Sequence, residues 1–295
     1  MIRGEETMLD LRMRSFLEVV ETGSYTAAAK KLNLTQPAVT QHISRLEEHY
    51  GCQFFCPEGR GVRLTDAGLR FHDYACMQHC NEKQLIKDLQ GLQPALRLGS
   101  TLSIADYYLP EKLAAMCISD GFSPHVIVGN TKYLLGKLLE GQLDAAFIEG
   151  IFDRSLFESR IFTTPRFMPV VSANHPLVGK RIHHEQLHAY PLIVREPGSG
   201  TRAIMENYLA YCNDSPLSFS KIWEIGSFAL IKNLLRQTNA VSFMYEAVAK
   251  REVERGELAF LSIEGYALRH DMHFVYLRHT LQSRELNRFF DEMMK

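Results

Sequence analysis

The chain lacks any long hydrophobic run, and this absence argues against a membrane-spanning protein. None of its 295 residues lies in a window that approaches the roughly 18 consecutive apolar residues of a membrane-spanning helix. The N-terminal sequence MIRGEETMLDLRMRSF has no apolar core of the kind that signal peptides carry, so we expect a cytoplasmic protein. A length of 295 residues with 46% hydrophobic residues predicts a globular chain of two or three domains.

An excess of positive charge is also missing. The formal net charge is -1, which gives no global attraction to nucleic acid. Between Ser24 and Arg70, six lysines and arginines stand against four acidic residues, an excess too small to indicate DNA binding by itself. Any argument for DNA binding therefore depends on the pattern of neutral polar residues.

Typical metal or catalytic spacings are absent as well. The chain has six cysteines, and four of them form two pairs with C-x3-C spacing: Cys52 with Cys56, and Cys76 with Cys80. Zinc ligands usually follow C-x2-C or C-x4-C spacing instead. We interpret the cysteines as free thiols, with zinc binding or thiol sensing as the weaker alternative. The sequence shows no P-loop, nucleophile elbow or recognisable Ser-His-Asp set. We therefore expect no cofactor, no metal and no enzymatic activity.

A segment rich in amides and hydroxyls, LNLTQPAVTQHISRL at residues 32–46, is present instead. Val39, Ile43 and Leu46 repeat with the spacing of one buried helix face. Thr35 precedes them and is a good N-cap, which stabilises a helix by about 1 kcal/mol. The opposite face shows Gln, Thr and Ser, where a solvated helix would usually carry Lys and Glu.

The flanking segments predict a winged helix-turn-helix around this helix. An apolar stripe at 13–20 predicts a helix that ends at Gly23, and YTAAAKKL predicts a short second helix. CQFFCPEGRGVRLT alternates around a glycine-rich turn and predicts a β-hairpin, the wing. Base edges in the major groove are hydrogen-bond donors and acceptors, so a reading helix needs amides and hydroxyls. The alternative is a polar surface on an ordinary three-helix bundle. We predict that base edges and phosphates are contacted by Ser24, Thr26, Thr35, Gln36, Pro37, Ala38, Thr40, Gln41, Ser44, Arg45, Arg60 and Arg63.

Residues 65–92 and the segment after them predict a second kind of architecture. The first stretch contains no proline and predicts one helix of roughly 40 Å, whose apolar side we expect to pack against another copy of the chain. After Pro94, strand patterns such as HVIVGN and LDAAFIEG alternate with helix patterns such as TKYLLGKLLEG. This order predicts a mostly parallel α/β sheet. Two such units with a returning strand at 270–278 predict two lobes with a cleft.

The cleft is predicted to bind a small molecule. VREPGSGTRAI at 194–204 places a turn before a helix, so backbone amides and the helix dipole favour an anion there. Other polar residues stand at the carboxyl ends of predicted strands, where ligands bind in α/β folds. The alternative is a set of helix starts that cap themselves. The predicted effector contacts are Ser100, Thr101, Ser103, Asn130, Thr131, Glu149, Arg195, Gly198, Ser199, Gly200, Thr201, Arg202 and Ser227, for an anion or a carboxylic or amino acid.

The segment FLEVVETGSYTAAAKKLNLTQPAVTQHISRLEEHYGCQFF, followed by GRGVRLTDAG, resembles the N-terminal region of LysR-type transcriptional regulators. LDAAFIEG, YPLIVREPGSGTR and EIGSFALIKNLL extend the resemblance over the rest of the chain. It implies a multi-domain fold: an α-rich winged helix-turn-helix, a long linker helix and a two-lobed α/β domain like a type 2 periplasmic binding protein. The implied bounds are 8–65 for the DNA-binding domain, 66–93 for the dimerisation helix and 94–295 for the effector domain, with lobe I at about 94–162 and 268–295 and lobe II at about 163–267.

The resemblance also implies partners. Members of the family are usually dimers or dimers of dimers that bind promoter DNA, respond to a small metabolite and act on RNA polymerase. Two other functions remain open from the residues alone: an enzyme on a solute-binding scaffold, and a passive metabolite-binding protein. Turnover of a cleft ligand would favour the enzyme.

Overall fold

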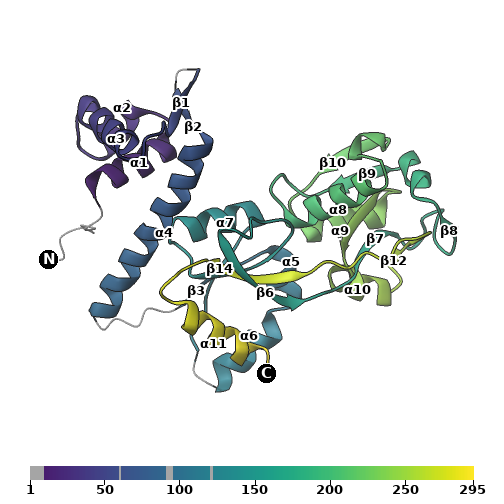
Figure 1. Cartoon of the computed structure of the whole chain (residues 1–295). Coiled ribbons are helices and arrows are strands. Elements are labelled where there is room, and N and C mark those ends of the chain that lie inside the picture. Colours follow the sequence, from purple (N-terminus) through teal and green to yellow (C-terminus); the bar gives the residue numbers. More distant parts are fainter. Residues whose placement is uncertain (1–9, 60, 91–95, 120–121) are drawn as a thin grey trace. The chain divides into compact units, whose positions relative to one another are not determined.

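A computed structural model describes residues 10–59, 61–90, 96–119 and 122–295 (Figure 1). The chain divides into two compact units, and each has its own hydrophobic core. The first unit holds residues up to 94 with Leu139–Gln142 and Leu277–Glu285; the second holds Ala95–Leu138, Leu143–Tyr276 and Leu286–Lys295. None of the described helices combines the length and the hydropathy that a bilayer crossing requires.

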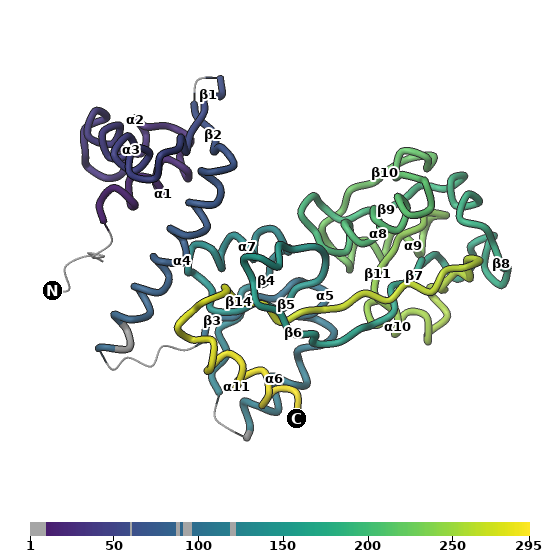
Figure 2. Tube along the Cα trace, viewed as in Figure 1, coloured from purple at the N-terminus to yellow at the C-terminus, as the bar shows by residue number. Residues whose placement is uncertain are grey.

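The first unit contains the predicted winged helix-turn-helix and linker helix. Figure 2 shows its first three helices gathered into a bundle, with the hairpin and the start of the long helix beside it. Phe16, Val39 and Ile43 are buried at the centre of this bundle, as the apolar spacing predicts. The elements are α1 (Leu11–Thr22), α2 (Tyr25–Lys31), α3 (Gln36–Tyr50), β1 (Phe55–Glu58), β2 (Gly61–Leu64) and α4 (Asp66–Leu89).

Short-range signals fix where these helices begin and end. The Ser24 hydroxyl accepts from the Ala27 amide at 3.4 Å, and the Thr35 hydroxyl accepts from the Ala38 amide at the same distance. Gly51 ends α3 with a φ of 68°, a left-handed conformation that side chains with a Cβ disfavour. The predicted N-cap at Thr35 is therefore confirmed.

Replacing Thr35 with alanine removes the hydroxyl that caps α3. We expect the free energy of unfolding to fall by about 1 kcal/mol, because one amide of the first turn loses its acceptor. Urea unfolding of the full chain, followed by helical circular dichroism, measures the change. Ser44→Ala makes the same kind of change at an exposed position inside α3 and should be neutral or slightly stabilising. Equal losses for both variants would show that the cap contributes nothing.

Helix α4 combines a buried start with exposed apolar side chains further along. Phe71 and Ala75 pack into the core of the first unit. Leu69, Tyr74 and Leu89 are 52%, 43% and 79% exposed, although they are apolar. Such side chains along one helix are typical of a surface that another subunit covers.

The second unit contains two five-stranded sheets, one in each lobe (Figure 1). The strand orders are β4-β3-β5-β14-β6 in lobe I and β10-β9-β11-β7-β12 in lobe II. The strands are β3 (Arg97–Ser100), β4 (His125–Val128), β5 (Ala145–Glu149), β6 (Phe157–Thr163), β7 (Phe167–Ser172), β8 (Arg181–Ile182), β9 (Pro191–Val194), β10 (Lys221–Glu224), β11 (Val241–Tyr245), β12 (Leu258–Phe260), β13 (Ser262–Ile263) and β14 (Met272–Leu277). The helices are α5 (Leu102–Tyr107), α6 (Pro110–Ser119), α7 (Thr131–Leu139), α8 (Gly200–Tyr211), α9 (Phe228–Gln237), α10 (Glu246–Glu254) and α11 (Ser283–Met293), with short 3₁₀ turns η1 (His184–Ala189) and η2 (Pro216–Ser218).

The prediction of mostly parallel sheets needs a correction. β3 pairs in parallel with β4 and β5, and β9 pairs in parallel with β10 and β11. However, β14 runs antiparallel to β5, and β7 runs antiparallel to β11 and β12. β7 and β14 are the strands that the chain enters after passing from one lobe to the other, so no crossover helix imposes a parallel direction on them. The sheets are mixed.

Two further differences have local causes. YYLPEKLAAMCI predicts one helix, but the structure has α5 and α6 with a break at Tyr108 and Leu109. Pro110 disfavours helical backbone at the residue before it, so the break falls there. Helix α10 is not predicted from the pattern, because its sequence EAVAKREVE is too polar to show a clear apolar stripe.

A candidate DNA-reading face and a candidate effector site

Helix α3 presents a continuous polar face to solvent. Its buried residues are Val39, Ile43 and Leu46, so the helix has a single apolar side. Gln36 donates from Nε2 to the Thr40 hydroxyl at 3.0 Å, which orients both side chains one turn apart on the exposed side. The exposed members of the predicted face are Gln36, Pro37, Thr40, Gln41, Ser44 and Arg45, and Ala38 is half-buried beside them.

The predicted phosphate contacts lie at two helix starts and on the wing. Ser24 and Thr35 are the N-caps of α2 and α3, and Thr26 is exposed in the first turn of α2. Helix N-termini and hydroxyls are suitable donors to phosphate oxygens. Arg63 is exposed on β2, with its Nε 3.9 Å from a Glu58 carboxylate oxygen. Arg60 lies outside the described residues.

Glu149 is the centre of the predicted effector set. It ends β5 and is only 2% exposed. Its carboxylate accepts hydrogen bonds from the hydroxyls of Thr101 and Ser103, the latter at 3.2 Å. The Thr131 hydroxyl donates to the Glu149 backbone carbonyl at 2.7 Å. Two separate segments of lobe I, at 101–103 and at Thr131, therefore converge on this buried residue at the end of β5.

The start of α8 in lobe II packs directly against this acid. A Cβ built on Gly200 would lie 2.2 Å from the Glu149 carbonyl oxygen, so only glycine permits this approach. The Ser199 and Thr201 hydroxyls are hydrogen-bonded to each other at 2.8 Å, and both residues are buried. The Lys132 amide donates to the Gly198 carbonyl at 3.3 Å. The two lobes are thus closed against each other around Glu149.

The other predicted residues have separate local roles. The Arg195 guanidinium donates to Glu196 at 2.9 Å and not to Glu149, and it lies over the Phe228 ring. Arg202 donates to two carboxylates, on α8 and β10. Asn130 and Ser227 accept from backbone amides and cap α7 and α9, and the hydroxyl of the buried Ser100 donates to the Thr101 carbonyl.

Burial controls the ionisation of Glu149. It raises the pKa of this carboxyl to about 7, because its charged form has lost water. The hydrogen bonds from Thr101 and Ser103 and the positive charge of Arg195 oppose this change without cancelling it. The site therefore contains an acid that can be neutral or charged near neutral pH.

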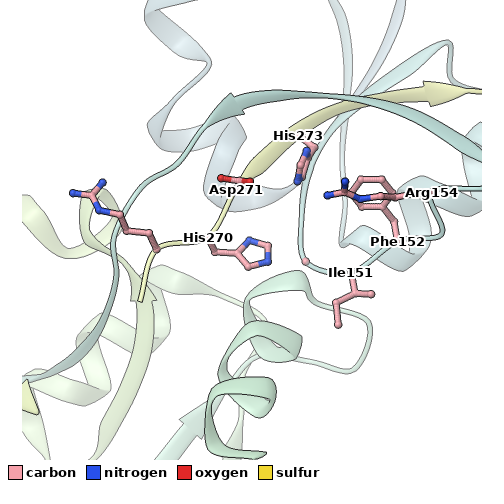
Figure 3. A pocket seen from close by; sticks show the side chains of 8 residues that line it. Ile151, Phe152, Arg154, His270, Asp271 and His273 are labelled. Atoms are coloured by element: carbon pink, nitrogen blue, oxygen red, sulfur yellow. The ribbon is translucent and has the colours of Figure 1, made fainter. Parts of the chain in front are cut away.

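The sequence pattern missed a pocket that lies beside this set. The loop after β5 and the segment that leads into β14 line an open pocket of roughly 370 Å³. Its charged and imidazole side chains are Arg154, Arg269, His270, Asp271 and His273 (Figure 3). Among the residues that the structure describes, no three histidine, cysteine, aspartate or glutamate side chains are grouped to hold a metal ion.

Comparison with known proteins identifies the family. Residues 11–69 match the family described as bacterial regulatory helix-turn-helix protein, lysR family, and residues 89–295 match the LysR substrate binding domain. The transcriptional activator CmpR of Synechocystis sp. is 31% identical over 284 residues, which cover 94% of this chain and 91% of CmpR. The regulator CbbR of Rhodospirillum rubrum is 30% identical over 271 residues, or 90% and 88% of the two chains.

Solved structures show the same fold. Full-length LysG from Corynebacterium glutamicum, solved with its effector Arg, aligns with a TM-score of 0.64 at 16% identity and covers 96% of this chain and 97% of LysG. The Synechocystis CcmR regulatory domain, solved with 2-PG, aligns with a TM-score of 0.60 at 22% identity and covers 68% and 95%. The chain belongs to the LysR family: it is a DNA-binding transcriptional regulator with a C-terminal effector-binding domain.

Proposed function

We propose that α3 reads base edges in the major groove and that neighbouring donors hold the phosphates. The observation that supports this assignment is the exposed face of α3 from Gln36 to Arg45, which is polar but has one full charge, on Arg45; the next exposed charge, Glu48, lies one turn further on. Bases are proposed to contact Gln36, Pro37, Ala38, Thr40, Gln41, Ser44 and Arg45, and phosphates are proposed to contact Ser24, Thr26, Thr35, Arg60 and Arg63. Residues 8–65 act as the DNA-binding domain, 66–93 as the dimerisation helix and 94–295 as the effector domain.

Binding to the DNA upstream of the protein's own gene tests the DNA-binding role. Fluorescence anisotropy with that duplex, against a scrambled duplex of equal length, should show a preference that persists as salt is raised. Specific complexes are usually about 10³-fold or more tighter than non-specific ones. Equal affinity for both duplexes at all salt concentrations would show that the upstream DNA contains no operator for this protein.

We propose that the effector binds between the lobes, around Glu149 and the start of α8. The fold alone does not set the ligand's charge, because neighbours of this fold are solved with 2-PG and with Arg. The site's own residues favour an amino acid. The start of α8 suits a carboxylate, whereas Glu149 suits an ammonium group. The proposed contacts are the set predicted from the sequence, with Thr101, Ser103, Thr131, Ser199 and Thr201 nearest to Glu149.

A double substitution at the start of α8 tests the effector site. Ser199→Ala with Thr201→Val removes two buried hydroxyls and should abolish the rise in melting temperature that an effector causes in the wild-type chain. Amino acids and small carboxylic acids are the compounds to screen by thermal shift. Ser262→Ala, which removes an exposed hydroxyl on β13, is the matched control and should keep the full rise. If the effector raises the melting temperature of the double variant as much as that of the wild type, the effector binds at another site.

We propose further that the chain acts in the cytoplasm as a homodimer or homotetramer and contacts RNA polymerase at its promoters. Exposed apolar side chains on α4, among them Leu69 and Leu89, support an interface between copies. We propose that the effector is bound without turnover, as expected for a member of a family of transcriptional regulators.

A further inference from the structure

The pocket between the loop after β5 and the segment before β14 has a buried imidazole in its wall. His273 is on β14, opposite Ile148 of β5, and is 5% exposed. Its Nδ1 has no hydrogen-bond partner among the residues that the structure describes. A buried polar atom without a partner is costly in a folded protein, so its position in a cavity wall points to a ligand.

Charged and imidazole side chains of both signs surround this imidazole. Figure 3 shows the Arg154 guanidinium beside His273, with the His270 ring across the cavity and Asp271 next to His273. Burial, Arg154 and His270 together lower the pKa of His273, and Asp271 opposes them. A neutral imidazole still has one N–H to donate. With Arg269, the wall carries two guanidinium groups against one carboxylate.

Thr164, on the connection from β6 to β7, holds two of these groups in place through its side chain and its backbone. The Thr164 hydroxyl donates to Asp271 at 2.6 Å, and the Arg269 guanidinium donates to the Thr164 carbonyl at 3.1 Å. Arg166 and Arg269 also form an antiparallel backbone bridge between the two connections that join the lobes. The donors therefore approach the pocket from three segments: Arg154 from the loop after β5, His273 from β14, and Arg269 from one of the connections that join the lobes.

We propose that this cavity binds the phosphate group of a small metabolite, at a site separate from the one around Glu149. A tetrahedral oxyanion accepts hydrogen bonds from several directions, which matches donors placed on three segments better than a planar carboxylate does. Asp271 selects phosphate over sulfate, because a phosphate monoanion retains a P–OH that can donate to a carboxylate, whereas sulfate has no proton to donate. Roughly 370 Å³ leaves room for an organic remainder, which packs against Ile151 and Phe152.

Thermal unfolding and calorimetric titration of the full chain with inorganic phosphate, sulfate and acetate, at constant ionic strength, test the proposal. Phosphate should raise the melting temperature more than sulfate, and sulfate more than acetate. Arg154→Gln should weaken phosphate binding by about 10- to 100-fold, since a hydrogen bond to a charged group is lost. Arg255→Gln removes an equal charge at an exposed position after α10 and should leave phosphate binding unchanged.

Two more variants separate the possible sites. Asp271→Asn should raise the affinity for sulfate to that for phosphate, because the substitution removes the repulsion between the Asp271 carboxylate and the sulfate oxygens. Ser199→Ala with Thr201→Val should leave the phosphate response intact, since those hydroxyls lie outside this cavity. A phosphate response no larger than that of acetate, or one that Arg154→Gln leaves unchanged, overturns the site. Sulfate binding as tight as phosphate binding in the wild type overturns the assignment to phosphate.

Discussion

Replacing Gln36 and Thr40 with alanine together should remove most of the preference of this chain for its operator, while its affinity for unrelated DNA changes little. Both side chains are exposed on the polar face of α3 and are hydrogen-bonded to each other, so we expect them to enter the groove as one oriented pair. A lost base contact costs about 1–3 kcal/mol, roughly 10- to 100-fold in affinity, and two such losses approach the difference between specific and non-specific binding. Non-specific affinity persists because it comes from phosphate contacts.

Gln53→Ala is the matched control for this experiment. It removes an exposed glutamine side chain just beyond α3, at a position with no proposed DNA contact. Anisotropy titrations of the wild type, the double variant and Gln53→Ala against operator and scrambled duplex give, for each protein, the ratio of its affinities for the two duplexes. If the double variant keeps the wild-type ratio, α3 does not read the bases through this face.

The N-terminal unit could be predicted closely because its signals are local. Thr35, Pro37 and Gly51 act within one turn of the residues they affect, and the spacing of Val39, Ile43 and Leu46 fixes which face is buried. Such short-range chemistry can be recognised in a sequence without knowing the fold. The exposure of the reading face follows from the same spacing.

The effector domain was predictable in its parts but not in its assembly. The polar strand ends were identified, yet nothing in the sequence showed that Glu149 would accept hydrogen bonds from both Thr101 and Ser103. The phosphate pocket was missed because Arg154 and His273 are far apart in the chain and each is unremarkable alone. Such sites depend on which segments the topology brings together, and that information is not local.

The largest effect on stability is expected at Glu149, as a dependence on pH. Folding raises the pKa of this carboxyl from an ordinary 4.5 to about 7, so the folded state holds the proton more tightly than the unfolded state does. Below about pH 4.5 both states are protonated and there is no penalty. As the pH rises to about 7, stability falls, and above that the full loss is about 3 kcal/mol. Arg195, Tyr108 and Tyr245 also interact electrostatically with this carboxyl.

Glu149→Gln should remove this part of the pH dependence, because an amide of similar shape has no proton to lose in this range. Urea unfolding between pH 4 and pH 8 should give curves that meet at low pH and separate as the pH rises, with the variant more stable. Glu254→Gln, the same change at an exposed acid on α10, should follow the wild type throughout. Parallel curves for Glu149→Gln and wild type would mean that this carboxyl is hydrated and the lobes are open in solution.

The same measurement also distinguishes the charge of the effector. A ligand that places an ammonium group against Glu149 stabilises the carboxylate, lowers its pKa and should flatten the stability curve of the wild-type chain. A ligand with only negative charge acts in the opposite direction and extends the loss of stability to higher pH. Because Glu149→Gln has no carboxylate to respond, its curve should keep the same shape with either ligand, so a difference between wild type and variant reports directly on contact with this residue.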